Sequence, residues 1–340
     1  MINENKIKFV FFLFSCVFLL SFVTGNACSV TALEDEDSLI VARNMDWPES
    51  AGLVVMNPKG VKKTAIFVPE ELTPLTWQSE YGSITFDLLA PIPEMGTLNS
   101  PGGGMNEAGL YVGTLFADDM ICPKPSGNPV VTCLDIVRLL LDTCKTADEA
   151  LDMLSNIDIL PLTLNDIQVT FHYFIIDRDG KCFIIEFPPQ SKGRMMIHTP
   201  LYKTTTNEFY EVNAFILYQY EPFGGDNPIP DSSVKRTSDV RLVRATYYSL
   251  EAMKKGNISF DDGFFVMESA RQFEGTIASD SATDWTVCFD LKNLVIEWTS
   301  FFNPERRLID MKKLSFDDIG KMISVDIQSS GTGDFTKYFK

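Results

Sequence analysis

The sequence predicts a mixed α+β fold in which antiparallel sheets are covered by helices. Strand-like segments come first, helical segments follow, and strand-like segments return near the end of the chain. Two pairs of strand-like segments are separated by short polar turns, as the strands of β-hairpins are. No β-α-β unit repeats along the chain, so parallel strands joined by crossover helices are not expected.

Residues 1–27 have the layout of a secretory signal peptide. Two lysines precede an apolar run over 9–22, and a stretch of small residues ends at Ala27. That run is shorter than the about 20 residues that a membrane span needs. We therefore expect cleavage after Ala27, export to the periplasm or the medium, no stable membrane span afterwards, and a single domain over 28–340. The alternatives are an uncleaved anchor and a lipoprotein signal that ends at Cys28.

Alternating polarity and turn residues predict the strands. Segments 28–33 and 39–45 should pair around the acidic turn 34–37. Further predicted strands are 64–68, 83–89 and 110–116, and a glycine-rich turn is predicted over 102–109. Two later hairpins are predicted, 169–176 with 182–187 and 286–290 with 294–299, and an irregular tail follows from about Ser329.

Helical spacing and capping residues predict four helices. They cover 129–141, 147–155, 240–253 and 261–273. Thr146 and Glu149 form the capping-box pattern for the second helix, and Ser238 is the predicted N-cap of the third.

The net charge and the number of histidines limit the partners and the catalytic mechanisms that the chain can have. The net charge of −17 repels phosphate backbones, which argues against a nucleic-acid partner. The chain has two histidines, His172 and His198, and neither belongs to a metal-ligand pattern. We expect no metal and no cofactor. Any mechanism that pairs a serine or cysteine with a histidine would have to use one of these two.

Cys28 would be the first residue of the mature chain and would carry two reactive groups. The ordinary pKa of an α-amine is about 7.7–8.0 and that of a thiol about 8.5. A free amine can therefore accept the thiol proton directly or through a water, and no histidine is needed. The alternative is an ordinary buried cysteine near the cleavage point.

Arg43 and Asp46 lie on the strand that should pair with Cys28. A guanidinium near sulfur favours the thiolate, and a carboxylate can orient the α-amine. Alternation places Asp46 and Asn44 on one face of that strand and Arg43 on the other, so a bulge or the strand end would have to bring Arg43 and Asp46 together. The alternative is a surface ion pair.

Together these features resemble the choloylglycine hydrolase family. The matching segments are Cys28-Ser29, Ala42 to Trp47, Gly104 to Leu110, Thr206 to Phe209, Val240 to Ala245 and Thr283 to Thr286. The proline that the family usually has two places after Asn207 is absent. The family contains bile-salt hydrolases and penicillin V acylases, which are N-terminal-nucleophile enzymes with an αββα sandwich. The resemblance implies that fold, a small-molecule amide substrate and a possible homotetramer.

The resemblance also implies roles for five residues. Cys28 matches the nucleophile, which would form an acyl thioester, and Arg43 and Asp46 match the pair that flanks it. Asn207 matches the side chain that helps to bind the oxyanion, and Arg241 matches the second arginine of the site.

Phe116 and Trp47 bear on the substrate. Phe116 matches a position that is Asn in bile-salt hydrolases and aromatic in penicillin V acylases, and Trp47 resembles the Gram-negative branch. These residues favour an aryl or fatty acyl group, as in penicillin V or N-acyl homoserine lactones, unless both only pack in the core. The alternatives are a conjugated bile salt, another linear amide, and a catalytically inactive or lipid-anchored binding protein.

Overall fold

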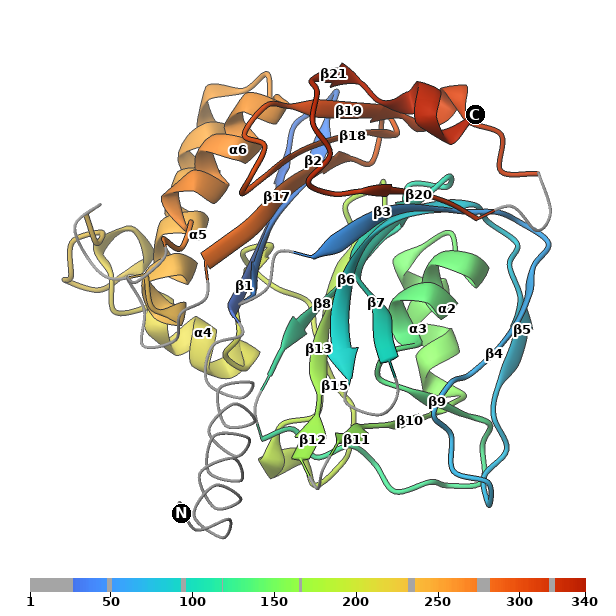
Figure 1. The fold of residues 1–340 in the computed structure, drawn as a ribbon. Coiled ribbons are helices and arrows are strands. Elements are labelled where there is room, and N and C mark those ends of the chain that lie inside the picture. Colours follow the sequence, from blue (N-terminus) through green and yellow to red (C-terminus); the bar gives the residue numbers. More distant parts are fainter. Residues whose placement is uncertain are drawn as a thin grey trace, which may run out of the picture.

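The computed structural model describes residues 27–47, 51–92, 96–117, 119–164, 167–231, 236–273, 282–317 and 322–340. The predicted signal peptide, apart from Ala27, lies outside these residues. The described part forms four layers, helices, sheet, sheet and helices, so the predicted αββα sandwich is confirmed (Figure 1). In this part, no helix is both long and apolar enough to cross a membrane.

The first sheet has seven strands and contains the first and the last strand of the described chain. Its order is β16-β1-β2-β17-β18-β19-β21, antiparallel except for the last pair. The strands are β1 (Ala27–Glu34), β2 (Leu39–Trp47), β16 (Thr204–Thr205), β17 (Ala282–Asp290), β18 (Val295–Ser300), β19 (Arg307–Asp310) and β21 (Gly333–Asp334).

The second sheet has eight antiparallel strands in the order β15-β14-β13-β8-β7-β6-β3-β20. They are β3 (Gly52–Asn57), β6 (Ser83–Ile92), β7 (Gly96–Asn106), β8 (Tyr111–Phe116), β13 (Phe171–Ile176), β14 (Cys182–Glu186), β15 (Met196–His198) and β20 (Ile323–Asp326). Three short pairs lie outside both sheets: β4 (Lys62–Thr64) with β5 (Thr76–Gln78), β9 (Val130–Thr132) with β10 (Asp158–Leu160), and β11 (Leu162–Leu164) with β12 (Ile167–Val169).

Helices cover the outer face of each sheet. Figure 1 shows α5 (Ser238–Lys255) and α6 (Phe260–Ser269) against β1, β2 and β17, and α2 (Ile136–Thr143) and α3 (Ala147–Ser155) against β7, β8 and β13. The short α4 (Tyr210–Leu217) packs on α5. Because each sheet is covered on both faces, alternate residues enter different cores: Val41 and Met45 of β2 face the second sheet, while Ala42 packs with the α5–α6 layer.

The hairpin that begins the domain is confirmed. Cys28 pairs with Met45 and Leu33 with Ile40 across the turn. The hairpins β13–β14 and β17–β18 are confirmed as well, although β13 begins two residues later than predicted, at Phe171.

The prediction of a glycine-rich turn over 102–109 is wrong for its first half. The glycines at 102–104 lie inside β7, and the chain turns only after Asn106. They leave room for neighbouring side chains, because a Cβ on Gly103 would lie 3.0 Å from the Tyr111 hydroxyl and 3.4 Å from Arg43 Nη1. Glycine in a strand marks such a close approach.

Two other boundaries are wrong for local reasons. The predicted helix 129–141 begins only at Ile136, because the β-branched segment Val130–Thr132 forms strand β9. The predicted strand 64–68 overlaps β4 only at Thr64, since Phe67 has a left-handed backbone with φ of 55° that a strand does not allow.

The predicted caps are nearly right. Thr146 caps α3 by accepting the Glu149 N–H at 3.2 Å, but the Glu149 carboxylate accepts from Lys145 N–H and so does not close the box. The N-cap of α5 is Thr237, one residue before the predicted Ser238.

The ends of the last two segments differ from the prediction. Helix α6 begins at Phe260 and ends at Ser269, before the predicted end at residue 273. The prediction of an irregular tail from about Ser329 is wrong in part, because the tail contains β21 and a short 3-10 helix over Thr336–Phe339. Phe335 and Phe339 are buried in the core between the sheets.

Candidate active site

Cys28 lies at the start of β1, at the end of the core between the sheets. Its side chain shares a face with Val30 and Ala32 and is 5% exposed. Its sulfur lies 3.5 Å from Arg43 Nη2 and 3.6 Å from Met45 Sδ. The sulfur is therefore within reach of a cation in an otherwise apolar setting.

Arg43, on the neighbouring strand β2, extends past that sulfur across the space between the sheets. Its Nη2 also donates a hydrogen bond to the carbonyl of Thr114 at 2.5 Å. Glycines in the second sheet make room for the guanidinium: a Cβ on Gly113 would lie 2.8 Å from Arg43 Nη1 and 2.5 Å from the Tyr111 hydroxyl. Such contacts would force the arginine to move, so the glycine-bearing strands are part of the site.

The charges around Cys28 oppose one another. Burial raises the pKa of the Cys28 thiol, the Arg43 guanidinium lowers it, and the Asp46 carboxylate raises it again. The net effect is a raised pKa while the Cys28 nitrogen remains in a peptide bond. A thiol in this state needs a nearby base before it can act as a nucleophile.

Asp46 lies on the opposite face of β2 from Arg43, as alternation predicted, and pairs with Arg241 of α5. Its carboxylate accepts from Thr283 Oγ1 at 2.5 Å, from Gln272 Nε2 at 3.0 Å and from Arg241 Nη1 at 3.4 Å. Burial raises the pKa of Asp46 to about 6, even though Arg241 and these hydrogen bonds lower it. A bulge in β17 beside Asp46 brings Thr283 to the carboxylate.

Arg241 and Asn207 connect the start of β1 to other elements. Arg241 Nη1 donates to the Cys28 carbonyl and to Ser29 Oγ, both at 2.8 Å, and Nη2 donates to Asn207 Oδ1 at 3.0 Å. The Cys28 N–H also donates to Asn207 Oδ1, at 2.8 Å.

The orientation of the Asn207 amide follows from its partners. Two donors meet Oδ1, and Nδ2 donates to the Phe116 carbonyl at 2.8 Å. An amide nitrogen carries two hydrogens, so the second hydrogen of Asn207 Nδ2 has no partner in the described part of the chain. The structure thus brings together Cys28, Arg43, Asp46, Asn207 and Arg241, from β1, β2, the segment before α4, and α5.

Phe116 and Trp47 lie at the ends of strands β8 and β2, and both are half-buried. The Phe116 ring packs edge-on against Phe171 with centroids 6.2 Å apart, and only its carbonyl enters the polar network. Trp47 packs against the core cluster that also contains Cys28. Phe116 is thus linked to the polar network by its carbonyl, and Trp47 shares a core with the candidate nucleophile.

Several contacts were not predicted. Ser29, Met45 and Thr283 lie inside the motifs, so their proximity could have been inferred from the hairpins. Tyr111 and Gln272 carry no sequence signal, because their place depends on how the sheets and helices pack.

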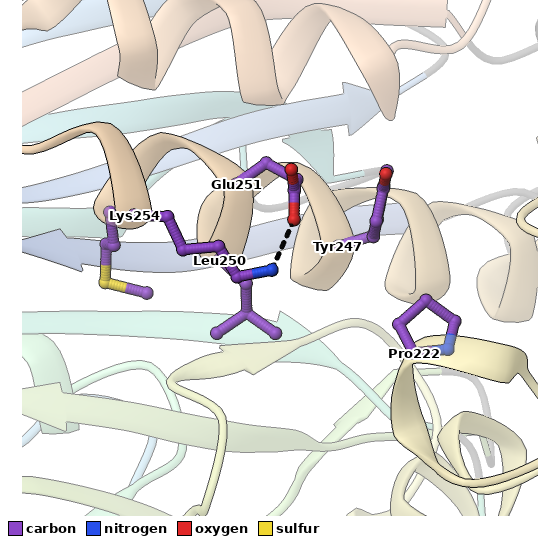
Figure 2. A pocket seen from close by; sticks show the side chains of 6 residues that line it. Pro222, Tyr247, Leu250, Glu251 and Lys254 are labelled. Atoms are coloured by element: carbon purple, nitrogen blue, oxygen red, sulfur yellow. Dashed lines mark hydrogen bonds and ion pairs between the residues drawn. The ribbon is translucent and has the colours of Figure 1, made fainter.

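A surface pocket of about 470 Å³ lies away from these residues, on the outer side of α5 (Figure 2). Its lining consists of Pro222, Tyr247, Leu250, Glu251, Met253 and Lys254. None of them contacts Cys28 or the residues bonded to it among the described interactions.

Comparisons with known proteins agree with this arrangement. The fold resembles penicillin V acylase from Agrobacterium tumefaciens, with a TM-score of 0.75, 22% sequence identity, and coverage of 92% of this chain and 96% of that one. It also resembles two variants of conjugated bile acid hydrolase from Clostridium perfringens, each with a TM-score of 0.71, 17% identity, and coverage of 90% and 98%. Such identities establish the fold alone.

No curated protein sequence matches this chain. The family model of linear amide C–N hydrolases, choloylglycine hydrolase family, matches residues 28–323 and so begins at Cys28. Because this match covers most of the chain, the protein belongs to the choloylglycine hydrolase family and is a hydrolase of linear amides.

Proposed function

We propose that the mature chain is an exported acylase that attacks its amide substrate with the thiol of an N-terminal Cys28. The observation that carries the proposal is the convergence of Arg43, Asn207 and Arg241 on Cys28. The family match that begins at this residue supports the same reading.

Proton transfer would begin at the new N-terminus. Cleavage after Ala27 would turn the Cys28 nitrogen into an α-amine, held by Asn207 Oδ1 and near the Asp46–Arg241 pair. The free amine would take the proton from the thiol, and Arg43 would stabilise the resulting thiolate at 3.5 Å. No other base is required.

The thiolate would then attack the amide carbonyl. The remaining hydrogen of Asn207 Nδ2, together with a backbone N–H, would bind the oxyanion, and each such donor is worth about 3 kcal/mol. The α-ammonium would protonate the leaving nitrogen. An acyl thioester on Cys28 would remain, and a water deprotonated by the α-amine would hydrolyse it.

The substrate inference rests on apolar side chains near Cys28. Phe116 is linked to Asn207 by its carbonyl and has no polar side-chain group, and Trp47 packs against the core cluster that contains Cys28. This favours an aryl or fatty acyl group, as in penicillin V or an N-acyl homoserine lactone, over the hydroxylated steroid of a conjugated bile salt. Export and a homotetramer remain part of the proposal and are checked by fractionation and light scattering.

The test is hydrolysis by the mature protein, with a free Cys28 verified by mass, beside its Cys28→Ala variant. The substrates are penicillin V, a medium-chain N-acyl homoserine lactone, and glycine- and taurine-conjugated bile salts. Cys122→Ser is the matched control, because Cys122 is a free thiol outside the site. We expect Cys28→Ala to lower kcat/KM by at least about 1000-fold, and the control to change it less than about twofold.

Two results would contradict the proposal. Unchanged hydrolysis by Cys28→Ala would remove the nucleophile assignment. Preference of the mature protein for bile salts would keep the nucleophile and overturn the substrate class.

A further inference from the structure

Both histidines of the chain converge on one buried carboxylate, Glu186, at the end of β14. Glu186 Oε1 lies 3.1 Å from His198 Nε2, and Oε2 lies 3.7 Å from His172 Nδ1. The Tyr210 N–H donates to both oxygens, at 3.2 and 3.1 Å, and the Tyr210 ring stacks on His198 with centroids 4.5 Å apart. Glu186 is 1% exposed. The function described so far uses none of these groups.

Tyr210 is the first helical residue of α4, and its N–H donates to the Glu186 carboxylate. Glu186, at the end of strand β14, therefore caps this helix. The N-cap residue Phe209 has no polar side chain and makes no capping bond. The first N–H groups of a helix need acceptors, and a negative charge there also interacts favourably with the helix dipole. Glu186 provides both.

The carboxylate stays charged in this position. Burial alone would raise the pKa of Glu186, but the nearby rings of His172 and His198 and the N–H of Tyr210 outweigh it and lower the pKa to about 2. The cap is therefore anionic at any pH at which the enzyme would work.

The start of α4 is tied to Asn207, which lies only three residues earlier. Within α4, Asn213 Nδ2 donates to the Glu208 carbonyl at 3.0 Å and to Thr205 Oγ1 at 3.1 Å. The segment that carries Asn207 is thus fixed to strand β16 on one side and to the first turn of α4 on the other. A shift of that turn would move the Asn207 amide relative to Cys28.

We propose that Glu186 is a positioning residue, which holds Asn207 in place beside Cys28 by capping α4. The inference rests on the proposed role of Asn207 in binding the oxyanion. The oxyanion develops only after the thiolate attacks and is absent from the bound substrate, so a misplaced Asn207 lowers kcat and leaves KM nearly unchanged.

The experiment is a double-mutant cycle with Glu186→Gln and Asn207→Ala in the mature enzyme. Glu186→Gln keeps an acceptor for one N–H but removes the charge, and we expect kcat to fall about tenfold with KM within about twofold. In the Asn207→Ala background the same change should alter kcat by less than about twofold, because its effect passes through Asn207. The matched control is Glu211→Gln, which removes an exposed acidic group from the first turn of the same helix.

Amide hydrogen exchange gives a second readout that does not depend on activity. Glu186→Gln should speed exchange at Tyr210 and its neighbours, whereas Glu186→Asp, which keeps the charge, should speed it less and Glu211→Gln should not change it.

The outcomes separate this inference from the proposed function. An equal fall of kcat in both backgrounds, or unchanged exchange at Tyr210, overturns the positioning role. Full activity of Asn207→Ala overturns the oxyanion assignment instead.

Discussion

Arg43 and Arg307 are both fully buried arginines on the seven-stranded sheet, but their surroundings differ. The guanidinium of Arg307 donates four hydrogen bonds of 2.8–3.0 Å to Ser300 Oγ and to the carbonyls of Asn303, Ile327 and Ser329. Arg43 donates to one carbonyl and to sulfur, while its Nε and Nη1 have no hydrogen bond of good geometry among the described residues.

The pKa values of the two arginines also differ. Burial lowers the pKa of Arg307 to about 10, and its uncharged acceptors do not reverse this. Burial also acts to lower the pKa of Arg43, but the neighbouring Cys28 and Tyr111 outweigh it and raise the pKa. One arginine is surrounded by acceptors that hold loops together, and the other keeps its charge directed at a reactive group.

Two buried carboxylates repeat the contrast. Glu186 has its pKa lowered to about 2, whereas burial raises the pKa of Asp46 to about 6 despite Arg241. At Glu186 the hydrogen-bond donors outweigh burial, whereas at Asp46, which lies beside Cys28, burial outweighs the ion pair and the hydrogen bonds. Sites of catalysis commonly hold groups whose pKa is perturbed by burial.

The largest expected effect is that of Arg43→Met. A unit charge at 3.5 Å and an effective dielectric constant of about 20 favours the thiolate by about 5 kcal/mol, which corresponds to a fall of about 3000-fold in kcat/KM. The check is kcat/KM together with the pH dependence of Cys28 alkylation, whose midpoint should rise. An unchanged midpoint would mean that Arg43 serves only packing.

Arg307→Met should have the opposite profile. Four acceptors lose their donor, so we expect the free energy of unfolding to fall by about 3 kcal/mol, measured by urea denaturation. Its kcat/KM, measured under conditions where the protein is folded, should stay within about twofold. A loss of activity comparable to that of Arg43→Met would remove the distinction between the two arginines.

The stability of the folded protein in acid tests the lowered pKa of Glu186. The pKa of Glu186 is depressed to about 2 in the folded chain, against about 4.3 when unfolded. Its stabilising contribution is thus present above about pH 4.3 and is lost as the pH falls towards 2, and it amounts to about 3 kcal/mol. Glu186→Gln should flatten the dependence of unfolding free energy on pH in this window. A slope equal to that of the unmodified protein would contradict the lowered pKa.

The pH dependence of kcat/KM tests the raised pKa of Asp46. Because the pKa of Asp46 is raised to about 6, the group is ionised above that pH and becomes protonated below it, when its ion pair with Arg241 is lost. Protonation of the α-amine also lowers the rate in acid, so we expect kcat/KM to fall by a further tenfold for each pH unit below about 6, and Asp46→Asn to lack this further fall. An equal pH profile for Asp46→Asn and the unmodified protein would show that ionised Asp46 is not required.

The sequence predicted those features of the site that depend on residues close together in the chain. Alternation placed Arg43 and Asp46 on opposite faces of β2, and the hairpin placed Cys28 beside the strand that carries them. Asn207 and Arg241 came only from the family resemblance, because nothing in their spacing shows that α5 crosses β1 at Cys28.

The wrong predictions also concern residues whose structure depends on contacts with distant parts of the chain. The glycines at 102–104 have the composition of a turn, but they lie in β7 because Arg43 and Tyr111 need the space that side chains would fill. The tail after Ser329 was expected to be irregular, but Phe335 and Phe339 are buried and the last residues pack on β19 and β20. Contacts with strands elsewhere in the fold leave no local pattern in the sequence of the tail.

The hydrogen bond from the Cys28 nitrogen to Asn207 Oδ1 has a consequence for timing. It is already formed while that nitrogen belongs to a peptide bond, and an ammonium or amine could use the same acceptor. If cleavage follows Ala27, the precursor is latent but fully assembled: one broken bond supplies the missing base, and no side chain has to be rebuilt. Activity would then appear as fast as the leader is removed, and its onset would report processing without a separate folding delay.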